Sequence, residues 1–397
     1  MASALTTALP LALCIASGPP RPAAAAFSRT TALPALAEET VAPIARTIES
    51  LHRVPVEDLD TDVPEAVRPL LTQLKHELRE LVAARLGTAG DRPAAALQAE
   101  LVAALRQAGV HLGETKAKSP YGDVLDLQLE RPPAHPGLLA VTITLDVMCG
   151  ADSSLYVFRR EAAGWTLILA QESNGYDTVA GAQNLFDSSF SPPRPGEGWF
   201  VLVSGVNAWC TSNWQSLRFK VLRPGASPDE PKVILSSSQT IFGTDYKARI
   251  ERGVVALAFQ GDMSLDIDLM IREHSVRYRV QGDRATRVPP LATKPEDFLD
   301  EWVALPWDEA RRWTAPVAEL ERWHTRLEPK EPSAYGHSGV RSGKAGRAGA
   351  WWVQLCLEGK GLPAGLYFLV SKPAGAYRME AVQTKLPPRF HPTFACE

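Results

Sequence analysis

The spacing of hydrophobic residues changes along the chain from a helical pattern to an alternating one. In residues 35–112 leucines recur at intervals of three and four, most clearly from Val67 to Val82 and from Leu97 to Leu105. This spacing places apolar side chains on one face of a helix. Gly87 and Gly109 follow the two stripes, as glycine often follows a helix end. The pattern predicts an amino-terminal helical hairpin that caps a β core or forms an interface. Core packing is the preferred interpretation, because the stripes are too short for a coiled coil.

Residues 120–290 carry the period-two alternation of β-strands. In Leu138 to Met148 valine, isoleucine and leucine fall on one face, while threonine and Asp146 fall on the other. Further apolar runs follow, separated by loops that are rich in proline and glycine. We therefore expect a mainly antiparallel β core, built as a sandwich or as one strongly curved sheet.

Two apolar runs in this region predict a β-hairpin around a four-residue loop that ends in Gly164, a residue that tolerates positive φ. In that register Tyr156 faces Leu169. On the same side of the sheet, Phe158 faces Leu167. Both faces of the hairpin would be apolar, which indicates strands that are covered on both sides.

The carboxy-terminal part of the chain returns to helical spacing before a last pair of strands. Residues 291–330 predict two helices whose apolar positions include tryptophans and His324. We expect the tryptophans and His324 to be buried in the core, in preference to forming a site for a flat ligand or a metal. Residues 331–350 are rich in glycine, serine and basic residues and predict a flexible loop. Residues 351–397 predict a terminal β-hairpin unit. The whole chain is therefore expected to be an α+β protein.

Residues 1–27 have the features of a secretory signal peptide. An apolar stretch from Leu9 to Ile15 precedes helix-breaking residues and four alanines at 23–26, the small residues that signal peptidase accepts. No Lys or Arg precedes the apolar stretch, which is too short for a membrane span of about 20 residues. Cys14 offers lipidation as an alternative, but Leu13 before it is larger than such processing prefers. Plain cleavage is the preferred interpretation, and it predicts a secreted or periplasmic protein.

Four cysteines would remain in the cleaved chain. Export would place them in an oxidising compartment, where an even number indicates two disulfides. Four cysteines allow three pairings. We expect Cys149 with Cys210 and Cys356 with Cys396, because each pair lies within one predicted structural unit. Four unpaired buried thiols are the alternative if residues 1–27 are not a leader.

The run from Asp262 to His274 contains the best candidates for catalysis. Asp266 and Asp268 are two residues apart on a predicted strand, so both carboxylates point to the same side. A Ca²⁺ site or an acid/base pair needs that arrangement, and His274 is a further candidate on the same face. If residues 276–280 fold back on this strand, Asp268 faces Arg279 in an ordinary surface ion pair. We prefer the ion pair, and an acidic hydrolase or metal-dependent enzyme is the alternative.

A loop between two predicted strands is the best candidate for ligand binding. It contains Asn207, Trp209, Asn213 and Trp214, which combine aromatic surface with amide groups that can donate and accept hydrogen bonds. This combination suits a protein or glycan partner.

The net charge and the sequence motifs bear on which classes of partner, cofactor and reaction we expect. The net charge is −3 with both signs scattered along the chain, so we expect no nucleic-acid partner. The apolar stretch from Leu9 to Ile15 is too short to span a membrane, so we expect no membrane span. The chain has no G-x-S-x-G, H-E-x-x-H or C-x-x-C motif and no dinucleotide-binding or kinase-type glycine loop. We therefore expect no cofactor. The preferred function is a non-catalytic extracytoplasmic binding or scaffold protein.

Overall fold

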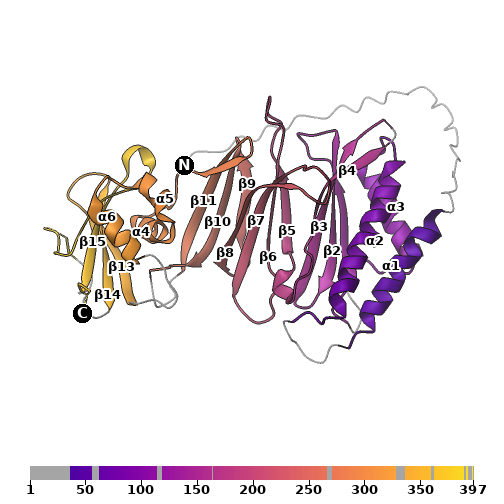
Figure 1. Cartoon of the computed structure of the whole chain (residues 1–397), viewed down its shortest axis with the longest axis horizontal. Helices are drawn as coiled ribbons and strands as arrows, with labels where there is room; N and C mark the ends of the chain where they lie inside the picture. Colours follow the sequence, from indigo (N-terminus) through magenta and orange to yellow (C-terminus); the bar gives the residue numbers. More distant parts are fainter. Residues whose placement is uncertain are drawn as a thin grey trace, which may run out of the picture.

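The protein is an α+β fold with helices at both ends of a series of antiparallel sheets (Figure 1). This confirms the predicted fold class. The predicted leader, residues 1–27, lies outside the part of the chain that the computed structural model describes. The described residues are 36–55, 62–113, 119–162, 164–265, 271–327, 336–358, 362–388, 390–391 and 396.

Three helices form a layer at the amino-terminal end. They are α1 (Leu36–His52), α2 (Val67–Gly87) and α3 (Ala94–Gln107). The predicted leucine stripe of α2 is buried, and it packs together with the stripe of α3 against one face of the first sheet. The helical region predicted from the sequence is therefore present, and its apolar stripes contribute to the protein's own core.

The first sheet lies between this helical layer and a second sheet. Its strands follow chain order: β1 (Val124–Glu130), β2 (Leu138–Val147), β3 (Gly150–Arg160) and β4 (Trp165–Gln171). Tyr156 and Phe158 face the helices, while Leu155 and Val157 face the second sheet. Both faces of the predicted hairpin are thus covered, as its apolar pattern indicated.

The pairing of β3 with β4 differs from the predicted register at one end. Phe158 lies opposite Leu167, as predicted, but Tyr156 lies opposite Ala170 rather than Leu169. A β-bulge just before Phe158 adds one residue to one strand, which shifts the rest of the pairing.

Gly164, at the end of this hairpin loop, is needed for a different reason from the one predicted. A Cβ atom there would lie 2.0 Å from the carbonyl oxygen of Gly87, the last residue of α2. The end of the helix therefore approaches the loop so closely that only glycine fits.

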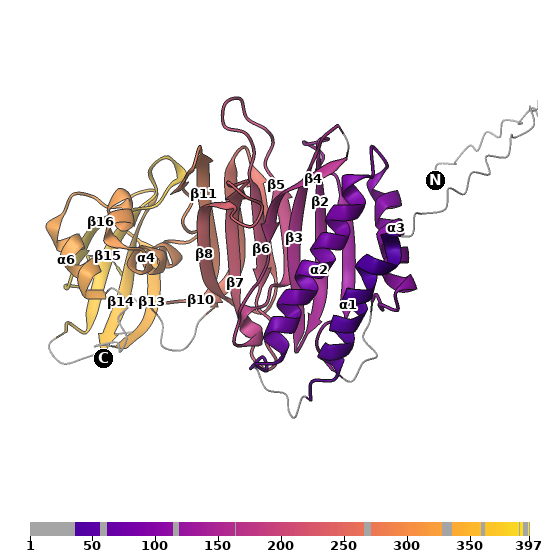
Figure 2. The same cartoon turned by 45° about the vertical axis from the view of Figure 1, so that its right-hand side comes forward.

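Two further sheets continue the stack, and Figure 2 shows the three sheets as successive layers. The second sheet has β5 (Asn184–Phe190), β6 (Val201–Val206), β7 (Trp214–Arg223) and β8 (Lys232–Phe242). The third has β9 (Tyr246–Glu251), β10 (Val254–Asp262), β11 (Ile271–Gln281) and β12 (Arg284–Arg287). Phe219 of the second sheet and Leu257 of the third belong to the apolar core between them. The predicted β core is therefore a stack of face-to-face sheets.

The hairpin predicted within residues 262–280 does not form. Residues 276–280 do not fold back, because they continue the strand β11, which pairs with β10 and β12. Arg279 accordingly lies opposite Val254. The predicted faces are also exchanged in β11: Arg272 and His274 are buried, whereas Ile271 is exposed.

The carboxy-terminal unit packs helices on one face of a fourth sheet. The helices are α4 (Pro295–Ala304), α5 (Trp307–Ala310) and α6 (Ala318–Leu327). The sheet has β13 (Gly336–Lys344), β14 (Ala350–Glu358), β15 (Gly365–Ser371) and β16 (Arg378–Gln383). Trp302 and His324 are buried in this unit, and the His324 Nε2 atom lies 3.0 Å from the Trp302 carbonyl oxygen.

One strand of this unit lies in the stretch that we expected to be a loop. Within residues 331–350, β13 pairs with β14 along its length, apart from one irregularity. Its glycines, serines and basic residues gave no apolar alternation, so its pairing with an apolar neighbour could not be read from its own composition.

Two disulfides confirm the predicted pairing of the cysteines. Cys149 bonds to Cys210, with Cα atoms 4.9 Å apart, and connects the turn between β2 and β3 to the segment before β7. Cys356 of β14 bonds to Cys396, with Cα atoms 5.2 Å apart. The first disulfide therefore joins the first sheet to the second, and the second attaches Cys396 to the fourth sheet.

Candidate functional site

The predicted binding loop divides into buried and exposed residues. Asn207 is buried, its Nδ2 atom donates to the Ala208 carbonyl oxygen at 3.1 Å, and its Oδ1 atom accepts from the Ser216 amide. Trp209 is 38% exposed, and Asn213 is exposed as well. The Asn207 amide therefore supports the loop, while Trp209 can meet a partner.

Trp214 joins this loop to the turn between β8 and β9. Its ring packs edge-on against Phe242, with ring centres 5.2 Å apart. The Gly243 amide of the same turn donates to the Asn213 carbonyl oxygen at 2.6 Å. The loop therefore fixes the position of the turn.

A hollow of about 610 Å³ opens beside this turn. Its volume lies within the range of about 300–1,000 Å³ that is usual for small-molecule sites. The lining combines aromatic residues with charged and amide ones, namely Phe242, Gly243, Thr244, Asp245, Tyr246, Lys247, Ala258, Phe259, Gln260 and Glu273. We call this set the turn hollow.

The turn hollow has an exposed polar rim beside aromatic residues whose rings belong to the core. Phe259 is buried and Tyr246 is half-buried, and the Tyr246 hydroxyl donates to the Leu185 carbonyl oxygen at 2.9 Å. In contrast, the side chains of Asp245, Lys247 and Glu273 are exposed. The two rings pack in the core between the second and third sheets, while the charged groups are accessible to a ligand.

A second, smaller hollow extends the turn hollow along the outer face of the third sheet. It has a volume of about 280 Å³ and shares Lys247 and Ala258 with the turn hollow. It continues to Arg249 and Arg277 over a floor that includes Ser275. The two hollows together can hold an extended ligand.

Another polar hollow, of about 370 Å³, lies between the first and second sheets. Asp126 of β1, Thr144 of β2 and Asp187 of β5 are among its lining residues. Burial raises the pKa of Asp187 above its ordinary value. Asp126 is exposed, as Asp245 is, so a substitution there is a matched control for one in the turn hollow.

The predicted acidic site is only partly within the described residues. Asp266 and Asp268 lie outside them, so their role stays a prediction. His274 is buried and stacks on Phe259, with ring centres 5.0 Å apart. Burial, followed by the nearby Arg272, lowers the pKa of His274 to about 4. The imidazole is therefore neutral at neutral pH, and its Nε2 atom lies 2.9 Å from the Asp262 carbonyl oxygen.

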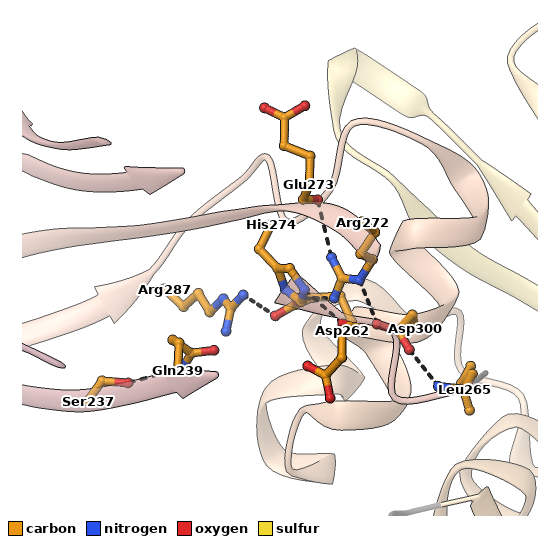
Figure 3. Close-up of polar contacts among 10 residues, drawn as sticks. Ser237, Gln239, Asp262, Leu265, Arg272, Glu273, His274, Arg287 and Asp300 are labelled. Atoms are coloured by element: carbon orange, nitrogen blue, oxygen red, sulfur yellow. Dashed lines mark hydrogen bonds and ion pairs between the residues drawn. The ribbon is translucent and has the colours of Figure 1, made fainter. Parts of the chain in front are cut away.

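His274 borders a buried cluster of charged side chains, which Figure 3 shows. Arg272 Nε lies 2.6 Å from Asp300 Oδ2, and Arg272 Nη2 lies 2.8 Å from Glu301 Oε2. Arg287 pairs with the other oxygen of Glu301. The arginines belong to β11 and β12 and the carboxylates to α4, so the cluster joins the sheet stack to the carboxy-terminal unit.

Each charge in this cluster is compensated. The second oxygen of Asp300 accepts from the Leu265 amide at 2.9 Å. Although desolvation acts against ionisation, the two arginines hold the pKa of Glu301 below its ordinary value. Removal of one partner from such a buried pair costs about 3–5 kcal/mol, so the cluster has a clear structural role.

In the described segments, no group of three or more His, Cys, Asp or Glu side chains is placed to hold a metal ion. None of the helices in those segments combines the length and apolar character needed to cross a membrane.

The turn hollow is not predicted by the sequence pattern. Its residues come from four strands and one turn, and they are close because β9, β10 and β11 pair side by side and β8 leads into the turn. The signal that was present is the short polar turn Gly243 to Asp245 between two aromatic residues.

Comparison with known proteins gives no family. No protein-family model matches the chain, and no curated protein is significantly similar. One solved structure, an α-L-arabinofuranosidase from Podospora anserina in complex with cellotriose, aligns with 68% of this chain and 92% of its own. Its sequence identity is 10% and its TM-score is 0.16, which is too low to support a conclusion about fold or function.

Proposed function

We propose that the protein is a non-catalytic binding protein that acts outside the cytoplasm and holds a glycan in the turn hollow. The single observation that carries the proposal is the lining of this hollow, in which exposed carboxylate and amide side chains lie beside the turn between β8 and β9. A sugar carries several hydroxyls that can donate to carboxylate and amide oxygens. The rim residues Asp245, Gln260 and Glu273 supply such acceptors.

The location outside the cytoplasm is supported by the two disulfides, which persist in oxidising compartments. The predicted leader is consistent with this location. A non-catalytic role is supported by the pairing of the buried ionisable groups around His274, because a general acid or base must exchange a proton with its substrate.

The proposal is tested by screening the purified protein against an array of glycans, with an array of peptides as the alternative partner class. We expect binding to glycans that is lost when Asp245 and Glu273 are replaced together by Ala and Gln. The control is Asp126→Asn in the hollow between the first and second sheets, which should leave binding unchanged. Binding to peptides alone, or loss of glycan binding in the control, would contradict the proposal.

A further inference from the structure

A lysine and an aspartate meet in the core between α2 and the first sheet. Lys75 is 2% exposed and Asp152 of β3 is 0% exposed. The Lys75 Nζ atom is in direct contact with Asp152 Oδ2 and also donates to the Ser173 carbonyl oxygen. Complete burial is rare for lysine, so this contact needs an explanation beyond an ordinary surface ion pair.

The surroundings of this pair resemble a reaction site more than a simple ion pair. The backbone amide of Gln183 donates to Asp152 Oδ1 at 3.0 Å. The Tyr176 hydroxyl lies 3.4 Å from Asp152 Oδ2, and the Tyr176 ring lies 5.3 Å from Lys75 Nζ. An amine therefore touches a carboxyl group whose two oxygens each have a hydrogen-bond donor.

We propose that Lys75 and Asp152 form an intramolecular amide bond between α2 and β3. Proton transfer within the pair gives a neutral amine and a neutral acid, and the nitrogen then attacks the carboxyl carbon. The new C–N bond places negative charge on Oδ1, beside the backbone amide of Gln183, as in an oxyanion hole. The C–Oδ2 bond then breaks. Two of the three ammonium protons leave with Oδ2 as one water molecule, and no oxidant or cofactor is needed.

Tyr176 is placed to relay a proton in this step. Its hydroxyl can give a proton to the departing Oδ2 and take one from the nitrogen, so that it is unchanged at the end. Burial and the nearby Asp152 raise the pKa of Tyr176 far above its ordinary value, which keeps the hydroxyl protonated and able to donate.

The core environment favours the amide over the ion pair. Two charges that are removed from water lose much of their solvation, and a neutral amide does not carry that cost. The reverse reaction needs a water molecule, which the buried site excludes. The exposed pair of Lys232 and Asp283 contains the same two residue types in water, and it should remain an ion pair.

Mass spectrometry of the reduced and denatured protein tests the proposal. We expect the parent chain to be lighter than its sequence mass by one water, and a tryptic digest to give a branched peptide that joins Lys75 to Asp152. Lys75→Arg and Asp152→Ala should each lack this loss, whereas Lys232→Arg should keep it. The parent digest gives the answer even if a variant does not fold. Full mass, with trypsin cleavage after Lys75 and two linear peptides, would overturn the proposal.

Discussion

Neighbouring side chains of β11 serve two different regions of the molecule. Arg272 and His274 point inward to the charged cluster, whereas Glu273 between them points away from it and lines the turn hollow (Figure 3). The inward groups are buried and paired, and the outward group is exposed. Because side chains alternate along a strand, a single strand can both hold the fold and present a binding surface.

The charged cluster and the outward face of β11 should differ most in how far a substitution lowers the free energy of unfolding. Replacing Arg272 by Met leaves Asp300 and Glu301 short of a buried partner, which should lower the free energy of unfolding by about 3–5 kcal/mol. Denaturant unfolding measures this change. The control is Arg279→Met on the same strand, where the side chain is exposed and the change should stay within about 0.5 kcal/mol. Equal effects of the two substitutions would show that the cluster has no special role.

A pH dependence should follow from His274. Its pKa is lowered from 6.5 to about 4 in the folded protein, so between these values the unfolded chain binds a proton that the folded protein does not. Stability should therefore fall as the pH falls through this window, by up to about 3 kcal/mol. Unfolding of the parent and of His274→Gln at several pH values measures the difference, and a variant with the slope of the parent would refute it.

The carboxyl group of Asp297 in α4 should make the stability rise, rather than fall, as the pH falls through part of this range. Burial raises its pKa to about 6, so the folded protein keeps its proton to a higher pH than the unfolded chain does. Its contribution to stability is present at low pH and is lost as the pH rises towards 6. The comparison of parent and His274→Gln at the same pH removes this contribution, since both proteins contain Asp297.

The smallest effect should come from the exposed part of the predicted loop. Trp209 is 38% exposed, so Trp209→Ala should change the free energy of unfolding by no more than about 0.5 kcal/mol. Trp214→Ala should cost more, because it removes the ring that packs on Phe242. A thermal unfolding series on the two variants gives the order, and a larger loss for Trp209→Ala would show that our assignment of the loop is wrong.

The sequence predicted those features that depend on local periodicity. The leucine stripe of α2 and the alternation of β2 gave elements that the structure contains, and both disulfides paired as expected. These predictions succeeded because burial on one face of an element repeats with the period of that element.

The failures have a common physical cause, which is that local pattern does not say where a chain turns. The alternation of residues 262–280 continues through a change of direction, so it gave a hairpin in the wrong place and exchanged the faces at Arg272 and His274. The turn hollow was missed because its side chains are brought together by strand pairing. The catalytic candidates Asp266 and Asp268 lie outside the described residues, and they stay predictions.

Titration of a glycan selected from the array, followed by calorimetry, tests the central claim most directly. If the turn hollow is the binding site, replacing Asp245 by Ala and Glu273 by Gln together should weaken binding at least tenfold, which is about 1.4 kcal/mol, while the stability of the fold is unchanged. Parent affinity in this double variant would contradict the account.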